Sequence, residues 1–375
     1  MNETAIQPAV NKSMNKSMDL LSRLLLAPAH DSALHETAML ELKTDLLSLS
    51  KNDFDDLSAL ASSNHVIVRG LEAFVSIVRP AGDDMRTRWA EVALAAERAR
   101  IANAIPFLHS ICECFAKHGL DVAVIKSLDH LPDLGSDLDL YTDAGPDAVH
   151  QLMKSQFDAR MAPRSWGDRL ARKWNFMIPG LPEAVEIHVG RLGQTGEQVA
   201  IASSLLGRTR SIVVDGLSFR ATSISDRLMI STLQRMYRHF YFRLCDVIDS
   251  ASLVDAGTID YADLRAAATA AGIWEGIATY LVIVSDYVER YRGDPIDLPR
   301  FVRAASRFGG DSVYYAREFL RVPILPESAG LYGSQLTGMF RRREMKSGAR
   351  LSLLPWLATA AVVGQKITGS DKGIW

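Results

Sequence analysis

The chain has 375 residues, of which 48% are hydrophobic and 23% are charged, and its formal net charge is −2. This composition excludes wholesale disorder, and the length predicts two or three packed subdomains. The small net charge excludes a global basic field that would attract nucleic acid or an acidic membrane, so a polyanion would have to bind locally. The three cysteines, and a first segment without a basic region before an apolar run, predict a reducing compartment, the cytoplasm.

The first third of the chain predicts helices. Residues 1–17 are polar and are expected to be flexible, whereas leucines recur at helical intervals from Leu21 to Leu47. Further helices are predicted over 54–61, over 66–78 and from Asp84 towards His118. Pro106 should kink this last helix or begin a new one, because proline lacks a backbone donor. Residues 18–120 are therefore expected to form an N-terminal helical region.

The pattern changes at residue 121. A short apolar, β-branched run, which is typical of a buried strand, occurs at 121–126, and further strands are predicted at 138–141, 173–178 and 184–189. Asp215-Gly216 suits the type I′ turn of a hairpin over 210–220. Helices are predicted at 145–157 and 197–206. Residues 121–222 are thus expected to form a mixed core, and strands are expected only there.

The last part of the chain predicts helices again. An apolar stripe from Leu233 to Ile248 predicts a single helix of more than four turns that starts near Ser225. Helices are also predicted at 261–271, 274–292, 299–308 and 311–320, which gives a C-terminal helical region over 223–325. The tail, 326–375, contains the longest apolar stretch, 351–364, which is too short to span a bilayer. Burial of this stretch is favoured over peripheral membrane contact, which the preceding basic residues would support.

Carboxylates on two of the predicted strands are candidates for a metal site. Asp137 and Asp139 flank Leu138, so strand alternation places both carboxylates on one face. Two anions this close repel each other unless a cation lies between them, and magnesium, which takes oxygen ligands, suits such a pair. Glu186 shares a face of its own strand with His188 and is the candidate third acid.

The order of these features resembles a known superfamily. The segments are IKS (125–127), SDLDLY (136–141), VEIH (185–188) and RHFYFRLCD (238–246). Over residues 18–290 or so, the chain is similar to the DNA polymerase β-like nucleotidyltransferases, and among them to an uncharacterised bacterial group. The resemblance implies an α+β fold, in which a small mixed β-sheet nucleotidyltransferase core is flanked by N-terminal and C-terminal helical regions.

The resemblance also implies an activity, the transfer of an NMP group from an NTP to an unidentified acceptor. Asp137, Asp139 and Glu186 would hold Mg²⁺ or Mn²⁺, with Glu186 acting as a ligand or as the base that accepts the acceptor's proton. The implied NTP contacts are Lys126, Ser127, Ser136, Arg172 and Lys173. Nine Arg or Lys stand against five Asp or Glu from Arg160 to Arg220, which supports local phosphate binding.

Other basic residues have two interpretations. Arg169, Arg238 and Arg243 are further candidates for phosphate contacts. Arg238, His239 and Arg243 equally suit the solvated face of an amphipathic helix, an interpretation that is slightly favoured. His188 is more often a structural hydrogen-bonding residue than a base, and Cys245 beside the apolar stripe is expected to be inert core.

Departures from the superfamily's pattern keep alternatives open. Ser127 stands where glycine is usual, Glu186 stands where aspartate is common, and an arginine before the Asp pair is missing, with Asp133 in that vicinity. A catalytically inactive nucleotide-binding or interaction module on the same fold is therefore the main alternative. A helical scaffold protein whose acids cap turns is a third possibility.

Overall fold

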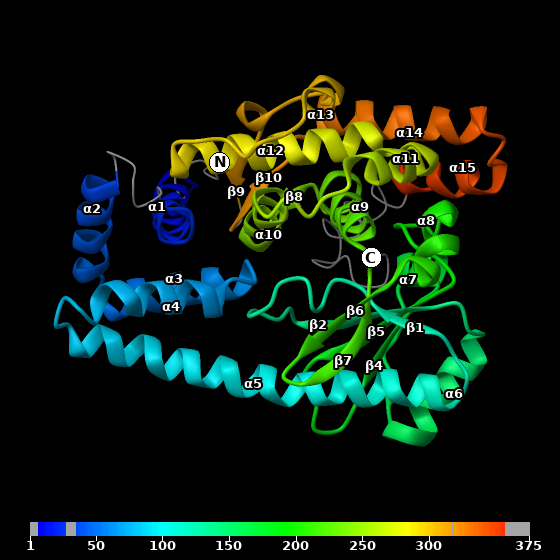
Figure 1. Cartoon of the computed structure of the whole chain (residues 1–375), viewed down its shortest axis with the longest axis horizontal. Helices are drawn as coiled ribbons and strands as arrows, with labels where there is room; N and C mark the ends of the chain where they lie inside the picture. Colours follow the sequence, from blue (N-terminus) through cyan, green and yellow to red (C-terminus); the bar gives the residue numbers. More distant parts are fainter. Residues whose placement is uncertain (1–6, 28–34, 317, 357–375) are drawn as a thin grey trace, which may run out of the picture.

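The computed structural model describes residues 7–27, 35–316 and 318–356, and the side chains from residue 16 onwards within these ranges. The fold combines helices with two sheets, so the expected α+β class is confirmed. In Figure 1 the large sheet lies between the long helix α5 on one side and the C-terminal helices on the other. Within the described residues, no helix is long and apolar enough to cross a membrane.

The large sheet has seven strands in the order β3-β4-β5-β2-β1-β7-β6. Its strands are β1 (Val122–Val124), β2 (Asp137–Thr142), β3 (Arg160–Met161), β4 (Lys173–Met177), β5 (Ala184–Val189), β6 (Arg210–Val214) and β7 (Leu217–Ala221). β2 is parallel to β5, and β1 is parallel to β7, whereas the other neighbours are antiparallel. Asp215 and Gly216 have φ angles of 49° and 78°, as the predicted type I′ turn between β6 and β7 requires.

The N-terminal helices pack beside this sheet. They are α1 (Gln7–Leu25), α2 (His35–Ser48), α3 (Lys51–Ser63), α4 (Ile67–Val78) and α5 (Asp84–Lys117). α5 continues through Pro106, so no new helix begins there. Of the expected flexible stretch, residues 1–6 lie outside the described residues, and residues 7–17 are helical because α1 begins at Gln7.

The two faces of the sheet differ in chemistry. Leu138, Val185 and Ile187 belong to the apolar core shared with α5 and with α6 (Pro146–Phe157). Strand alternation then places Asp139 and Glu186 on the opposite face, together with the buried Tyr141, which packs in the core of the C-terminal helices. The remaining helices of this part are α7 (Trp166–Ala171), α8 (Val199–Ser204) and a short 3₁₀ turn at Leu205–Arg208.

The C-terminal part follows the predicted helices with two exceptions. Its elements are α9 (Ile224–Gln234), a π-helical turn (Arg235–His239), β8 (Tyr241–Phe242), α10 (Leu244–Asp255), α11 (Tyr261–Ala271), α12 (Trp274–Arg292), α13 (Arg300–Ala305), a 3₁₀ turn (Gly310–Ser312), β9 (Tyr314–Ala316), β10 (Phe319–Arg321), a π-helical turn (Ile324–Ser328), α14 (Ala329–Arg341) and α15 (Met345–Leu351).

The first exception is the single helix expected from Ser225 to Ile248, which was wrong. The helix ends because Phe240 has a left-handed φ of 54°, and Tyr241 and Phe242 then pair with β10. Tyr241 also stacks on Phe319, with ring centroids 4.3 Å apart. These contacts turn the chain before α10 begins.

The second exception is the helix expected at 311–320, which was also wrong. Tyr314–Ala316 and Phe319–Arg321 are strands of a three-stranded sheet in the order β8-β10-β9. Their aromatic residues favour strands, and tertiary pairing with β8 decides the outcome. Strands therefore also form outside residues 121–220.

The described part of the tail is helical. Leu351 is buried, whereas Leu353 and Trp356 are exposed. Residues 357–364 of the apolar stretch lie outside the described residues.

Candidate functional site

The register of β2 and β5 brings two carboxylates together. Asp139 is the pairing partner of Glu186 across these parallel strands, so the two side chains stand at the same level on the polar face. Both are buried. His188 follows on the same face, and its Nε2 lies 2.8 Å from Glu186 Oε1.

Two lysines neutralise this pair. Lys126 follows β1 and makes an ion pair with Asp139, and its Nζ lies 3.7 Å from Glu186 Oε1. Lys173 on β4 places its Nζ 2.9 Å from Glu186 Oε2 and 3.0 Å from Asp168 Oδ1. The buried charges are thus balanced by protein groups, which a bound cation would have to compete with.

Ser127 fixes the start of the acidic strand. Its Oγ accepts a hydrogen bond from the Asp139 backbone N–H at 2.6 Å and donates to the Asp137 carbonyl oxygen at 3.4 Å. Its own N–H donates to the Ile125 carbonyl oxygen at 3.0 Å. Because these groups are already bonded, Ser127 positions Asp139 and does not offer the free amide and hydroxyl that a phosphate contact needs.

A polar cavity of about 250 Å³ opens in front of the carboxylates. Of the residues implied by the resemblance, it is lined by Lys126, Ser127, Ser136, Asp137, Asp139, Lys173 and Glu186. Asp137 is exposed. Arg172 does not line the cavity, because it ends α7 in a left-handed conformation with its side chain exposed. Arg169 is exposed on the same helix and lies against Trp166.

The turn between α9 and α10 supplies three arginines and a histidine, of which Arg238, His239 and Arg243 were expected on a solvated helix face. Arg235, Arg238, His239 and Arg243 all line the cavity, and none of them is fully exposed. Arg235 is buried and paired with Asp246, with 2.6 Å between Nε and Oδ2. The break at Phe240 brings this segment over the sheet, so the favoured interpretation as a solvated face was wrong.

Burial and charge shift the pKa values of the central groups. Burial raises the pKa of Asp139 to about 8, although Lys126 acts in the opposite direction. Burial also disfavours the charged form of Glu186, but Lys126, His188 and Lys173 together hold its pKa well below its usual range. Burial lowers the pKa of His188 to about 4, so its imidazole is neutral near pH 7. Glu186 is therefore firmly ionised, whereas for Asp139 burial favours the protonated form and the ion pair with Lys126 favours the charged form.

Asp139, Glu186 and His188 form a possible ligand set for a metal ion. One ligand atom from each lies within 4.8 Å of the others. The ring nitrogen of His188 that faces Glu186 is Nε2, whereas its Nδ1 is buried without a hydrogen-bond partner in the described part of the chain. Two carboxylates fit Mg²⁺ or Mn²⁺, and an added imidazole suits Mn²⁺ better than Mg²⁺. The sequence analysis placed Asp137, Asp139 and Glu186 in the ligand set and did not include His188.

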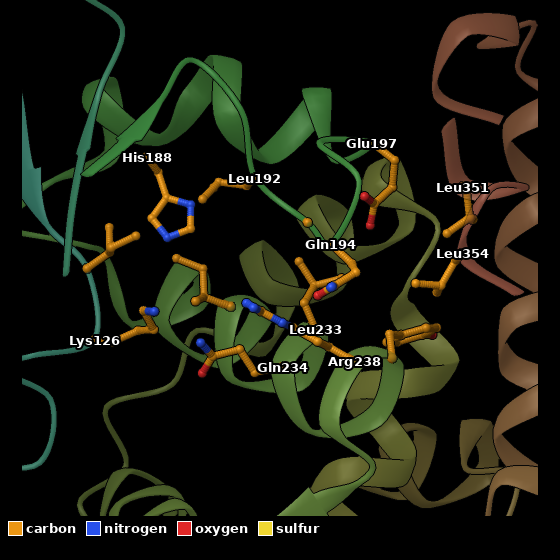
Figure 2. Close-up of a pocket in the computed structure, with 14 residues that line it drawn as sticks. Lys126, His188, Leu192, Gln194, Glu197, Leu233, Gln234, Arg238, Leu351 and Leu354 are labelled. Carbon is orange, nitrogen blue, oxygen red and sulfur yellow. The ribbon is translucent and has the colours of Figure 1, made fainter. Parts of the chain in front are cut away.

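A smaller, mainly apolar pocket of about 40 Å³ adjoins the cavity. Lys126, Gln234 and Arg238 line both spaces. In Figure 2, Lys126 and His188 stand on one side of the pocket, and Leu351 and Leu354 of the C-terminal segment stand on the other. The start of the predicted apolar stretch therefore contributes to this pocket wall.

No protein-family model matches this chain, and no curated protein matches it in sequence. What the site does must therefore be inferred from its own geometry.

Proposed function

We propose that the chain is a metal-dependent nucleotidyltransferase that moves an NMP group from an NTP to an acceptor. The observation that supports this most is the register that sets Asp139 beside Glu186 in a cavity also lined by Arg238 and Arg243. Carboxylates that hold a divalent cation and guanidinium groups that bind phosphate are complementary to a metal-bound triphosphate. The mixed sheet would then be the nucleotidyltransferase core that the resemblance implies.

The reaction is an in-line displacement at phosphorus. An acceptor hydroxyl oxygen bonds to the α-phosphorus and releases its proton to solvent water, while the bond from that phosphorus to the pyrophosphate oxygen breaks. Asp139 and Glu186 would hold the divalent cation, with Asp137 at the mouth of the cavity and His188 beside them. When bound, the cation supplies charge neutralisation for the phosphoryl oxygens.

The remaining roles follow from charge. Glu186, whose pKa lies well below its usual range, suits a metal ligand better than a base, because a base near neutral pH needs a pKa near 7. Arg238 and Arg243 would bind the phosphate oxygens. Lys126 neutralises Asp139 when no metal is bound, and a cation would compete with its ammonium group for that carboxylate.

The second candidate is a nucleotide-binding module without turnover. The bonding of Ser127 favours it, because both its N–H and its hydroxyl are used inside the turn. A phosphate would then rely on side-chain cations alone. This candidate predicts NTP binding that depends on metal but leads to no product.

The test uses NTPs labelled at the α-phosphate, Mg²⁺ or Mn²⁺, and acceptors drawn from sugars, lipids, proteins and RNA 3′ ends. Wild-type protein should transfer label and release pyrophosphate, and Asp139→Asn should do neither. Asp147→Asn, an exposed carboxylate on α6 that does not line the cavity, is the matched control and should behave as wild type.

Two results would decide against this assignment. Metal-dependent binding without transfer to any acceptor would support the second candidate. The absence of both metal-dependent NTP binding and transfer would contradict both candidates.

A further inference from the structure

A second group of metal-ligating side chains lies beside the cavity. His65 comes from the turn between α3 and α4, His130 comes from the loop between β1 and β2, and Cys245 comes from the first turn of α10. One ligand atom from each lies within 4.8 Å of the others. His65 and His130 also line the cavity, whereas Cys245 is fully buried behind them.

The fold holds His65 and Cys245 next to each other through Asn64. The Asn64 carbonyl oxygen accepts a hydrogen bond from the Cys245 N–H at 3.2 Å, and its Oδ1 accepts one from the Leu244 N–H at 3.1 Å. The start of α10 is thereby fixed against the turn that carries His65. That turn places His65 at a left-handed φ of 53°, and Gly135 leaves room for its ring, since a Cβ there would lie 3.2 Å from His65 Cε1.

His130 is oriented by a carboxylate one turn further along α10. Asp249 Oδ2 lies 2.5 Å from His130 Nδ1, so Nε2 is left to face Cys245 Sγ at 3.9 Å. Asp249 is itself held by Arg69, with 2.7 Å between Oδ1 and Nη1. A carboxylate bonded to the second nitrogen of a histidine is the usual outer-shell arrangement at zinc sites, because it fixes the ring and raises its basicity.

We propose that His65, His130 and Cys245 form a zinc site that is distinct from the carboxylate site. Two imidazoles and a thiolate are ligands for a borderline metal such as zinc and are poor ligands for magnesium. Ligands of a tetrahedral zinc ion with these bond lengths stand about 3.6 Å apart, so the 3.9 Å between Cys245 Sγ and His130 Nε2 needs only a small adjustment. A fourth position could be taken by water from the cavity.

Two groups compete with a cation for these ligands. Arg243 Nη1 lies 3.5 Å from His65 Nδ1, and a metal at that nitrogen would displace it. Burial works to lower the pKa of His130, but Cys245 and Asp249 raise it well above its ordinary value, so a metal would also replace a proton.

Cys245, His130 and Asp249 are also arranged as the nucleophile, base and orienting carboxylate of a catalytic triad would be. A catalytic thiol must be reached by a substrate atom, and Cys245 has no exposed surface. A metal ion needs only to enter between the side chains from the cavity side. Metal binding is therefore the better interpretation, and it would tie the N-terminal helices, the sheet and α10 together at one cavity wall.

Cobalt(II) titration of the reduced, metal-stripped full-length protein tests this site. Wild-type protein should bind cobalt with an intense near-ultraviolet thiolate-to-cobalt charge-transfer band and tetrahedral visible bands, and zinc should displace it. Cys245→Ser should lose the thiolate band. Cys114→Ser, a change at another free cysteine, should keep it.

Two further variants separate this proposal from misfolding and from the proposed function. His65→Gln, which lies in a turn, should weaken cobalt binding at least tenfold with unchanged circular dichroism. Asp139→Asn should keep the thiolate band even where it abolishes NTP transfer. Absence of the band in wild type, its retention in Cys245→Ser, or its loss in Cys114→Ser would overturn the proposal.

Discussion

Replacing Glu186 by glutamine should destabilise the metal-free protein by about 3 kcal/mol. Glu186 is buried and ionised, and its oxygens lie 2.9 Å from Lys173 Nζ, 2.8 Å from His188 Nε2 and 3.7 Å from Lys126 Nζ. Removing one partner of a buried ion pair costs about 3–5 kcal/mol, because the remaining charge stays buried. The lower end of this range applies here, because Lys173 keeps its ion pair with Asp168 and Lys126 keeps its ion pair with Asp139.

Urea unfolding in the presence of a chelator measures this loss. The pKa of Glu186 is lower in the folded protein than in the unfolded chain, so its stabilisation is present above about pH 4.5 and is lost as pH falls through the folded-state value. The difference between wild type and Glu186→Gln should therefore shrink below about pH 4. A loss under about 1 kcal/mol at pH 7 would refute the reasoning, and Asp147→Asn, exposed on α6, is the control with an unchanged midpoint.

Further predictions concern the same cavity and its supports. Asp139→Asn should lose the stabilisation by Mn²⁺ that thermal melts show for wild type, which is about 2.7 kcal/mol at one hundred times Kd. Arg243→Ala should raise the Kd for an NTP roughly 10- to 150-fold by removing a charge-assisted hydrogen bond of about 1.5–3 kcal/mol, whereas Arg172→Gln should leave it unchanged in the same calorimetric titration. Asn64→Ala should lower the urea unfolding free energy by about 1–3 kcal/mol, because the Asn64 side chain bonds the start of α10 and two carbonyl oxygens.

Local sequence patterns were sufficient to predict the side of the cavity that carries Asp139 and Glu186. The short apolar segments around Asp139 and Glu186 predicted the strands, and alternation predicted the face on which each acid lies. The parallel pairing of β2 with β5, which sets the acids side by side, is a tertiary property that strand patterns do not encode. Arg172 and Lys173 show the same limit, since both stand in a basic stretch and only Lys173 faces the cavity.

The arginine-rich side of the cavity, formed by the turn between α9 and α10, could not be predicted from the sequence. An apolar stripe with helical spacing runs from Leu233 to Ile248 whether the helix is continuous or broken. The break at Phe240 depends on pairing of Tyr241 with β10, a strand far along the chain that also resembled a helix. His65 likewise has no local feature that places it beside Cys245, because that contact arises from the packing of one turn against the start of α10.

The most direct measurement is Mn²⁺ binding followed by electron paramagnetic resonance, with zinc supplied in advance to occupy any site at Cys245. Wild-type protein with a non-hydrolysable NTP should remove one equivalent of free Mn²⁺ from the signal, and Asp139→Asn and Glu186→Gln should not. Equal Mn²⁺ binding by wild type and both variants, or none by wild type, would contradict a divalent-cation site built on these two carboxylates.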